Sequence, residues 1–325
     1  MEAFETLSPV YRSPTRPPAD LSAYDVTDDV AGLKTVLVNV FFIGEPGFGN
    51  PWVLVDTGIP GQTPAIRRRA EELFGIGCRP NAIVLTHGHF DHTGSLETLL
   101  AEWDVPVYAH RLEIPYLQGK SHYPPPGPAI GGGLMSLMSW LFPTKPLHLG
   151  NRVRVIADNG QIDELPGWRA IHTPGHAPGH ISLFRDSDRV LIAGDAFVTT
   201  NQNALSGVIS QREEFHGPPA YFTCDWEAAR QSVSQLAALN PTAAGTGHGV
   251  SVRGLDLRLG LQRLSNQFEE MSIPSSSGRY VRQAAITDGN GIVSMPAPTS
   301  FVVARAIGVA VVAGLIIWAL WPKRR

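Results

Sequence analysis

One stretch, Thr-His-Gly-His-Phe-Asp-His at positions 86–92, concentrates the side chains of this sequence that could do chemistry. It directly follows the apolar run 82–85, which is short and rich in β-branched residues and therefore typical of a buried strand. Gly88 lets the backbone bend tightly after this strand, because glycine has no side chain to obstruct the turn. His87 and His89 on either side of the bend can then point at one metal ion.

The second half of the stretch adds Asp91 and His92, just before a helix expected over residues 93–101. Side chains point in different directions where a loop leads into a helix. Asp91 and His92 can therefore face a second ion, apart from the one that His87 and His89 face. Imidazole nitrogens together with carboxylate oxygens suit zinc, and less exclusively iron or manganese. The alternative is a solvated histidine-rich turn without a metal, but the dense ligand spacing behind a buried strand argues against it.

Further candidate ligands stand beside glycine at the ends of later strands. They are His176 in Thr-Pro-Gly-His, Asp195 in Gly-Asp-Ala-Phe and His248 in Gly-Thr-Gly-His. Turns at one edge of stacked sheets would bring His176 to the first ion and His248 to the second, with Asp195 as a bridging carboxylate. Such a site holds a hydroxide between two ions and lowers its pKa toward neutrality. His180 is the alternative to His176.

Short strands and helices must position these residues. Strands are expected over residues 34–43, 52–55, 82–85, 105–109, 152–156, 169–172, 181–184, 190–193 and 242–244. Helices are expected over residues 62–74, 93–101, 110–117, 225–239 and 253–271. Asp56 closes the second strand of a hairpin, where it either orients a metal ligand from behind or caps a turn.

Taken together and in this order, the motifs resemble the metallo-β-lactamase superfamily over roughly residues 33–270. The resemblance implies a mixed α/β (α+β) fold, a four-layer αββα sandwich with two zinc ions at one edge. The implied metal ligands are His87, His89, Asp91, His92, His176, Asp195 and His248, and the candidate catalytic carboxylates are Asp56, Asp91 and Asp195. True β-lactamases of the best-known subclass carry cysteine in place of Asp195, so the chain looks like the glyoxalase II, lactonase and general hydrolase branch.

For that branch we expect a zinc-dependent hydrolase of an ester, thioester or lactone, in which the hydroxide held by the metals attacks the carbonyl carbon. The alternatives are a binuclear-metal phosphodiesterase and a catalytically silent scaffold tethered to a membrane. The net charge of −3 offers no basic surface for nucleic acid, so no nucleic-acid partner is expected. The expected partner is a small molecule.

The sequence divides into an extended lead-in (1–31), a hydrolase domain (32–271) and a linker (272–300). Residues 118–149 form an apolar insertion or a lid within the domain. Its glycine-rich segment 129–142 contains two methionines and a tryptophan, which suit contact with an apolar ligand. The alternatives are packing in the core or against another subunit, and a role as a lid or as a segment that dips into a membrane.

Residues 301–321 contain a single charged residue, Arg305. About 21 helical residues span roughly 30 Å, the thickness of a hydrocarbon core. This stretch predicts a transmembrane helix, with a buried terminal helix as the alternative. Residues 1–20 are polar and proline-rich, without the apolar run of a secretory signal. We therefore expect a chain anchored in a membrane by one C-terminal helix, with its catalytic domain in the cytoplasm.

Overall fold

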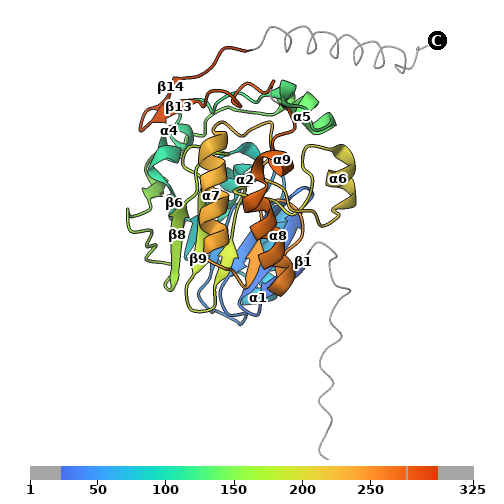
Figure 1. Cartoon of the computed structure of the whole chain (residues 1–325). Coiled ribbons are helices and arrows are strands. Elements are labelled where there is room, and N and C mark those ends of the chain that lie inside the picture. The colour runs from blue at the N-terminus through green and yellow to red at the C-terminus, as the bar shows by residue number, and fades with distance from the viewer. Residues whose placement is uncertain (1–22, 276, 299–325) are drawn as a thin grey trace, which may run out of the picture.

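Side chains alternate between two buried faces along the central strands of the structure. In β3 (Val38–Ile43), Val40 and Phe42 pack against helices, whereas Phe41 and Ile43 pack against a second sheet. A sheet that is apolar on both faces must be covered on both sides. The computed structural model describes residues 23–275 and 277–298, and Figure 1 shows the two sheets with helices outside them.

The first sheet has seven strands in the order of the sequence. They are β1 (Ala23–Thr27), β2 (Val30–Thr35), β3, β4 (Val53–Val55), β5 (Ala82–Val84), β6 (Val107–Ala109) and β7 (Val153–Val155). The pairs from β1 to β4 are antiparallel, and those from β4 to β7 are parallel. Val55 lies opposite Val84 in the parallel pair of β4 and β5. Asp56 and the 86–92 stretch, which follow these strands, therefore begin at the same edge of the sheet.

The second sheet has the strand order β12-β11-β10-β9-β8. Its strands are β8 (Trp168–His172), β9 (Ile181–Arg185), β10 (Val190–Ile192), β11 (Ala243–Gly245) and β12 (Val252–Arg253). Strands β10 and β11 run parallel with Ile192 opposite Gly245. This register brings Asp195 and the loop that carries His248 to the same end of the sheet.

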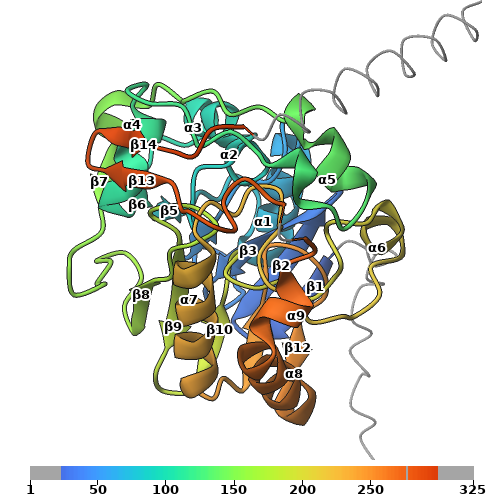
Figure 2. The ribbon, with the colours of Figure 1, turned by 45° about the horizontal axis from the view of Figure 1, so that its top comes forward.

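Two pairs of helices complete four layers in the order αββα. The residues of α1 (Thr63–Phe74) and α3 (Leu96–Glu102) pack on the outer face of the first sheet, and those of α7 (Trp226–Ala238) and α8 (Gly254–Asn266) on that of the second. Figures 1 and 2 show α7 and α8 side by side. Helix α1 buries Ile66, Ala70 and Phe74, one residue per turn on a single stripe. The shorter helices are α2 (Phe90–Thr93), α4 (Ile114–Leu117), α5 (Leu134–Met138), α6 (Leu205–Ser210) and α9 (Phe268–Ser272), together with 3₁₀ helices at Arg111–Glu113, Pro128–Ile130, Ser139–Leu141 and Gly150–Arg152.

The start of the domain differs from the sequence prediction. Residues 34–43 do not form one strand, because the chain turns at Val36, whose φ of +69° lies in the left-handed region. The turn makes β2 and β3 a hairpin, and β1 pairs with β2 outside it. Residues 23–31, which we predicted as an extended lead-in, therefore belong to the first sheet.

The predicted linker is also structured within the described residues. It contains the hairpin of β13 (Ile286–Asp288) and β14 (Gly291–Ser294). The Tyr280 hydroxyl donates to the Pro125 carbonyl at 2.8 Å, and the Ala285 N–H donates to the Cys224 carbonyl at 3.0 Å. These hydrogen bonds attach the segment to the rest of the described domain.

The predicted membrane anchor requires a correction. Across residues 23–275 and 277–298, the structure contains no helix that has both the length and the apolar character to cross a bilayer. The predicted helix of residues 301–321 lies outside the described residues. For residues 23–275 and 277–298 the fold assignment is therefore the αββα domain with no transmembrane helix, and the membrane-anchored location that we derived from the predicted helix is withdrawn.

Asn39 of β3 connects the first sheet to the loop after β11. Its buried side-chain amide donates to the Thr246 carbonyl at 2.8 Å and the Gly249 carbonyl at 2.9 Å. Its backbone N–H also donates to the Gly247 carbonyl at 2.7 Å. One residue thus holds the segment that carries His248.

Replacing Asn39 by alanine should leave two buried carbonyls without these donors. We expect the free energy of unfolding to fall by about 2–4 kcal/mol, because each unsatisfied buried group costs roughly 1–3 kcal/mol. Urea denaturation measures this change. The matched control is Asn151→Ala at an exposed position, where a change within about 0.5 kcal/mol is expected. An equal effect of both variants would contradict the role of Asn39.

Candidate metal centre

The predicted ligands converge from the ends of strands in both sheets. His87 and His89 follow β5 of the first sheet, whereas His176 follows β8 of the second. The structure places them in overlapping groups whose ligand atoms lie within 4.8 Å of one another: His87, His89 and His176; His87, His92 and Asp195; and Asp91, His92 and His248. All seven residues that we predicted as ligands are therefore brought together.

One carboxylate oxygen lies between the groups. The Oδ2 atom of Asp195 is 3.4 Å from Nε2 of His176, 3.5 Å from Nε2 of His92 and 3.2 Å from Nε2 of His248. Around it, Nδ1 of His89 is 3.0 Å from Nε2 of His176. Oδ2 of Asp91 completes the cluster at 3.6 Å from Nε2 of His248.

Several polar atoms in this cluster have no hydrogen-bond partner among the described residues. They are Nε2 of His87, His92 and His248, Nδ1 of His176 and Oδ1 of Asp195, all of them buried. Buried polar atoms are normally paired, since leaving one unsatisfied costs free energy. Converging nitrogen and oxygen lone pairs are the donor set that divalent metal ions take. The residues present therefore fit a metal site.

The charges of the cluster suit cation binding. Burial, together with the imidazoles of His92 and His89, holds the pKa of His87 well below its usual value, which keeps the ligating neutral form. Burial alone would raise the pKa of Asp195, but the His248 and His92 imidazoles hold it well below its usual range. Burial alone would lower the pKa of His92, but the carboxylates of Asp195 and Asp56 raise it well above its usual value. The carboxylates thus favour positive charge here, from a proton or from a metal ion.

Asp56 supports the cluster from behind. Its Oδ1 accepts the Thr86 N–H at 2.8 Å, and its Oδ2 accepts the Thr86 hydroxyl at 2.7 Å. The same Oδ2 lies 2.8 Å from Nδ1 of His92. A proton on Nδ1 satisfies this contact and leaves the lone pair of Nε2 facing the cluster. Asp56 has a φ of +59°, a left-handed conformation that is uncommon for residues other than glycine.

His180, the alternative ligand, is occupied elsewhere. Its Nε2 accepts the backbone N–H of Asp195 at 2.8 Å, and its Nδ1 lies 2.9 Å from the Thr173 hydroxyl. Burial lowers the pKa of His180 to about 3, so the ring is neutral and can accept at Nε2. This histidine positions Asp195, while His176 faces the ligand cluster.

Two polar residues that sequence reasoning missed also reach the centre. The Gln202 amide contacts Nδ1 of His248, and the buried carboxylate of Glu113 accepts the Gly88 N–H at 2.9 Å. Neither residue belongs to a histidine- or aspartate-rich motif. No spacing along the chain marks them, because their contacts form only in the folded state.

Aromatic rings border the cluster on one side. The Phe222 ring stacks on the His89 ring, with centroids 4.5 Å apart. Phe142, from the segment 118–149, lies 5.7 Å from Phe90 and 6.1 Å from Phe222 between ring centroids. The cluster of candidate ligands is therefore adjacent to an apolar wall formed partly by this segment.

Comparison with known proteins decides the family. The sequence model described as the metallo-beta-lactamase superfamily matches residues 33–248. The chain belongs to the metallo-β-lactamase superfamily. Its relative "Probable metallo-hydrolase YflN" of Bacillus subtilis (strain 168) is 44% identical over 250 residues, which cover 77% of this chain and 95% of that protein. This membership identifies the chain as a metal-dependent hydrolase and confirms the family predicted from its motifs.

More distant relatives extend the comparison. A hydroxyacylglutathione hydrolase of Hahella chejuensis (strain KCTC 2396) is 30% identical over 193 residues, which cover 59% of this chain and 53% of that protein. The crystal structure of a beta-lactamase domain protein from Burkholderia ambifaria is similar with a TM-score of 0.52 at 20% identity, covering 79% of this chain and 76% of that one. This structural similarity shows the fold of the superfamily.

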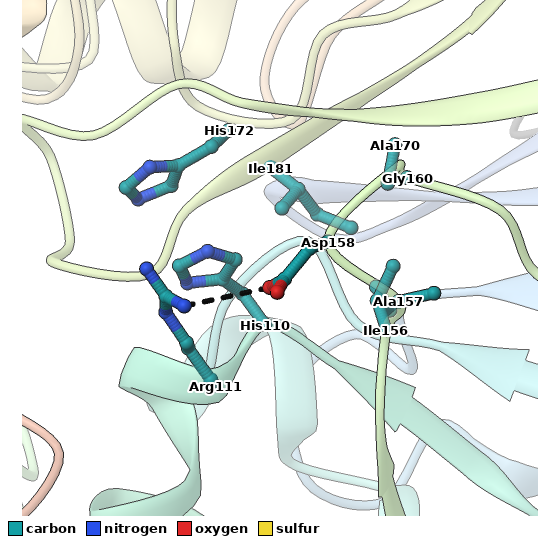
Figure 3. Close-up of a pocket in the computed structure, with 9 residues that line it drawn as sticks. All are labelled: His110, Arg111, Ile156, Ala157, Asp158, Gly160, Ala170, His172 and Ile181. Carbon is teal, nitrogen blue, oxygen red and sulfur yellow. Dashed lines mark hydrogen bonds and ion pairs between the residues drawn. The ribbon is translucent and has the colours of Figure 1, made fainter.

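A separate cavity of about 350 Å³ lies beside β7 and β8, at the open edges of the two sheets (Figure 3). The rings of His110 and His172 stack there with centroids 4.0 Å apart. The Arg111 guanidinium lies 3.4 Å from the carboxylate of Asp158. Burial, assisted by His172 and Arg111, lowers the pKa of His110 to about 4.

His110 should make stability depend on pH. The unfolded chain takes up this proton below about pH 6.5, whereas the folded chain takes it up only near pH 4, so stability falls as the pH drops through this window. In His110→Asn, the amide oxygen can still accept the Leu112 N–H, but the group no longer titrates. We expect this variant to lose less stability between pH 7 and 4.5, by roughly 1 kcal/mol after allowance for solvent screening.

Urea unfolding at both pH values, in the presence of a chelator, measures the difference. The control is His122→Asn at an exposed position, which should follow the wild type. Parallel pH dependence of the wild type and His110→Asn would contradict the prediction.

Proposed function

We propose that the chain is a binuclear zinc hydrolase that cleaves an ester, a thioester or a lactone. The observation that carries the proposal is the position of Oδ2 of Asp195, 3.2 Å from His248 and 3.4 Å from His176, which belong to different ligand groups. A carboxylate shared in this way suits two adjacent ions. The relative named hydroxyacylglutathione hydrolase supports an acyl substrate.

Each ion would have its own set of ligands. His87, His89 and His176 would hold the first, and Asp91, His92 and His248 the second, with Asp195 common to both. Zinc suits this mixture of imidazole and carboxylate, and iron or manganese also accept it. When bound, such a pair activates water and polarises the carbonyl that is cleaved.

Neighbouring side chains orient the proposed ligands. Asp56 directs the lone pair of His92 inward, and His180 holds the backbone of Asp195. The Asp91 side chain is 15% exposed, whereas that of Asp195 is 2% exposed. Asp91 therefore lies on the open side of the cluster, where substrate would approach.

Metal analysis of the full chain, coupled to hydrolysis of lactones, thioesters, aryl esters and bis-aryl phosphodiesters, tests the proposal. We expect two zinc ions per chain and acyl turnover that is lost on chelation and restored by zinc. Cleavage of phosphodiesters alone would instead indicate the binuclear phosphodiesterase. A chain that binds no metal would contradict the ligand assignment.

Asp195→Asn should weaken the binding of both ions, because the amide removes the shared charge and one acceptor. We expect acyl turnover to fall by at least about 100-fold, the upper range for a residue that only supports a metal ligand. Asp158→Asn, which changes an exposed carboxylate, should retain both metals. A cellular role that survives Asp195→Asn without metals would favour the catalytically silent scaffold.

The apolar wall beside the cluster motivates a narrower proposal, that the acyl part of the substrate is apolar. Phe142 comes from the segment 118–149, and Leu134, Trp140 and Leu141 of the same segment are exposed. These side chains offer an apolar approach to the ligand cluster. The segment would then act as a lid rather than as core packing.

Phe142→Ala should reduce kcat/KM for a long-chain ester by roughly tenfold or more, because burial of a large apolar side chain is worth about 1.5–3 kcal/mol. The loss for an acetyl ester should be about twofold or less. Phe48→Ala, at a position that is 88% exposed, serves as the control. Equal losses for the long and the short ester would remove the proposal of an apolar acyl substrate.

A further inference from the structure

Glu113 is a fully buried carboxylate that makes no ion pair with lysine or arginine within residues 23–275 and 277–298. It lies at the end of the 3₁₀ helix Arg111–Glu113, beyond β6. Its Oε2 accepts the Gly88 N–H at 2.9 Å, and its Oε1 accepts the Gly179 N–H at 2.7 Å. The Tyr123 hydroxyl also donates to Oε2.

The two backbone donors belong to different ligand loops. Gly88 stands between His87 and His89 in the loop after β5 of the first sheet. Gly179 stands three residues after His176 in the loop between β8 and β9 of the second sheet. One side chain therefore connects the loops that supply the first ligand group.

Glycine is required at both donor positions for this approach. A Cβ atom on residue 179 would lie 2.8 Å from Cγ and 2.9 Å from Oε1 of Glu113, closer than real Cβ atoms approach. A Cβ atom on Gly88 would collide with the Tyr123 hydroxyl. The absent side chains let the carboxylate and the phenol reach the two loops.

Tyr123 extends the connection to the apolar segment 118–149. Its ring lies 4.7 Å from the His89 ring between centroids and stacks on Tyr116 at 4.0 Å. The hydroxyl and the ring thus contact the carboxylate and a candidate ligand at the same time. The segment 118–149 thus contacts both Glu113 and His89 through Tyr123.

We propose that Glu113 is a positioning residue that sets the distance between the two loops carrying the first metal group. The inference rests on the proposed metal site. Hydrogen bonds to a carboxylate are stronger than those between neutral groups, so the two backbone N–H groups, one donating to each oxygen of Glu113, hold both loops firmly.

Glu113→Gln tests this role with almost no change in volume. The amide keeps one oxygen and replaces the other by an N–H₂ group, which cannot accept a backbone N–H. We expect the zinc dissociation constant of the full chain to rise about 10- to 100-fold in competition with a chromophoric chelator. Glu102→Gln, on the surface, should bind zinc like the wild type. Tyr123→Phe should weaken zinc binding less than Glu113→Gln, since it leaves both backbone hydrogen bonds in place.

A second readout separates positioning from a purely structural role. If Glu113→Gln lowers the Tm of the metal-free chain but binds zinc within threefold of the wild type, the inference is overturned. If Glu113→Gln does not fold, Gly179→Ala displaces the same carboxylate without changing its charge, and unaltered zinc affinity would overturn the inference. Zinc binding by the wild type without hydrolysis would contradict only the proposed function, because the Glu113 test measures affinity and not turnover.

Discussion

The structure depends on the burial of one carboxylate, that of Asp195, among imidazoles from both sheets. A buried charge is stable only where it meets opposite charge or hydrogen-bond donors. Oδ2 of Asp195 meets Nε2 of His176, His92 and His248 at 3.2–3.5 Å. These histidines follow strands or turns of separate sheets, so the cluster exists only when the two sheets are packed together in the correct register.

The register of the strands also determines the positions of the side chains that contact the candidate ligands. Parallel pairing of β4 with β5 places Asp56 where it accepts from Thr86 and contacts Nδ1 of His92. Parallel pairing of β10 with β11 places Asp195 beside the His248 loop. In both places a strand pair fixes the backbone, and a side-chain hydrogen bond then fixes which nitrogen or oxygen faces the centre. These strand pairs and hydrogen bonds together set the positions of the donor atoms.

Membership in the metallo-β-lactamase superfamily accounts for the sandwich and the metal-dependent hydrolysis, and aromatic side chains surround part of the cluster in this chain. The aromatic wall of Phe90, Phe142 and Phe222 borders the imidazole of His89. Phe142 enters from a segment that also brings Tyr123 to the same histidine. The proposed contact with an apolar substrate and the proposed support of His89 therefore involve neighbouring side chains of one segment, Phe142 and Tyr123.

The sequence by itself determined which residues are candidate ligands, because each follows a short apolar strand and stands next to or near a glycine, and both signals are local. It also indicated the alternating strands and helices of the sandwich. It did not reveal the turn at Val36, because a β-branched side chain normally disfavours a left-handed conformation. Its terminal apolar run led to a membrane assignment that is corrected above. Only the tertiary structure decided the roles of Glu113 and Asn39, since their partners lie 66 and 207 residues away along the chain. Contacts of that range are set by sheet packing, which no spacing of residues along a sequence encodes.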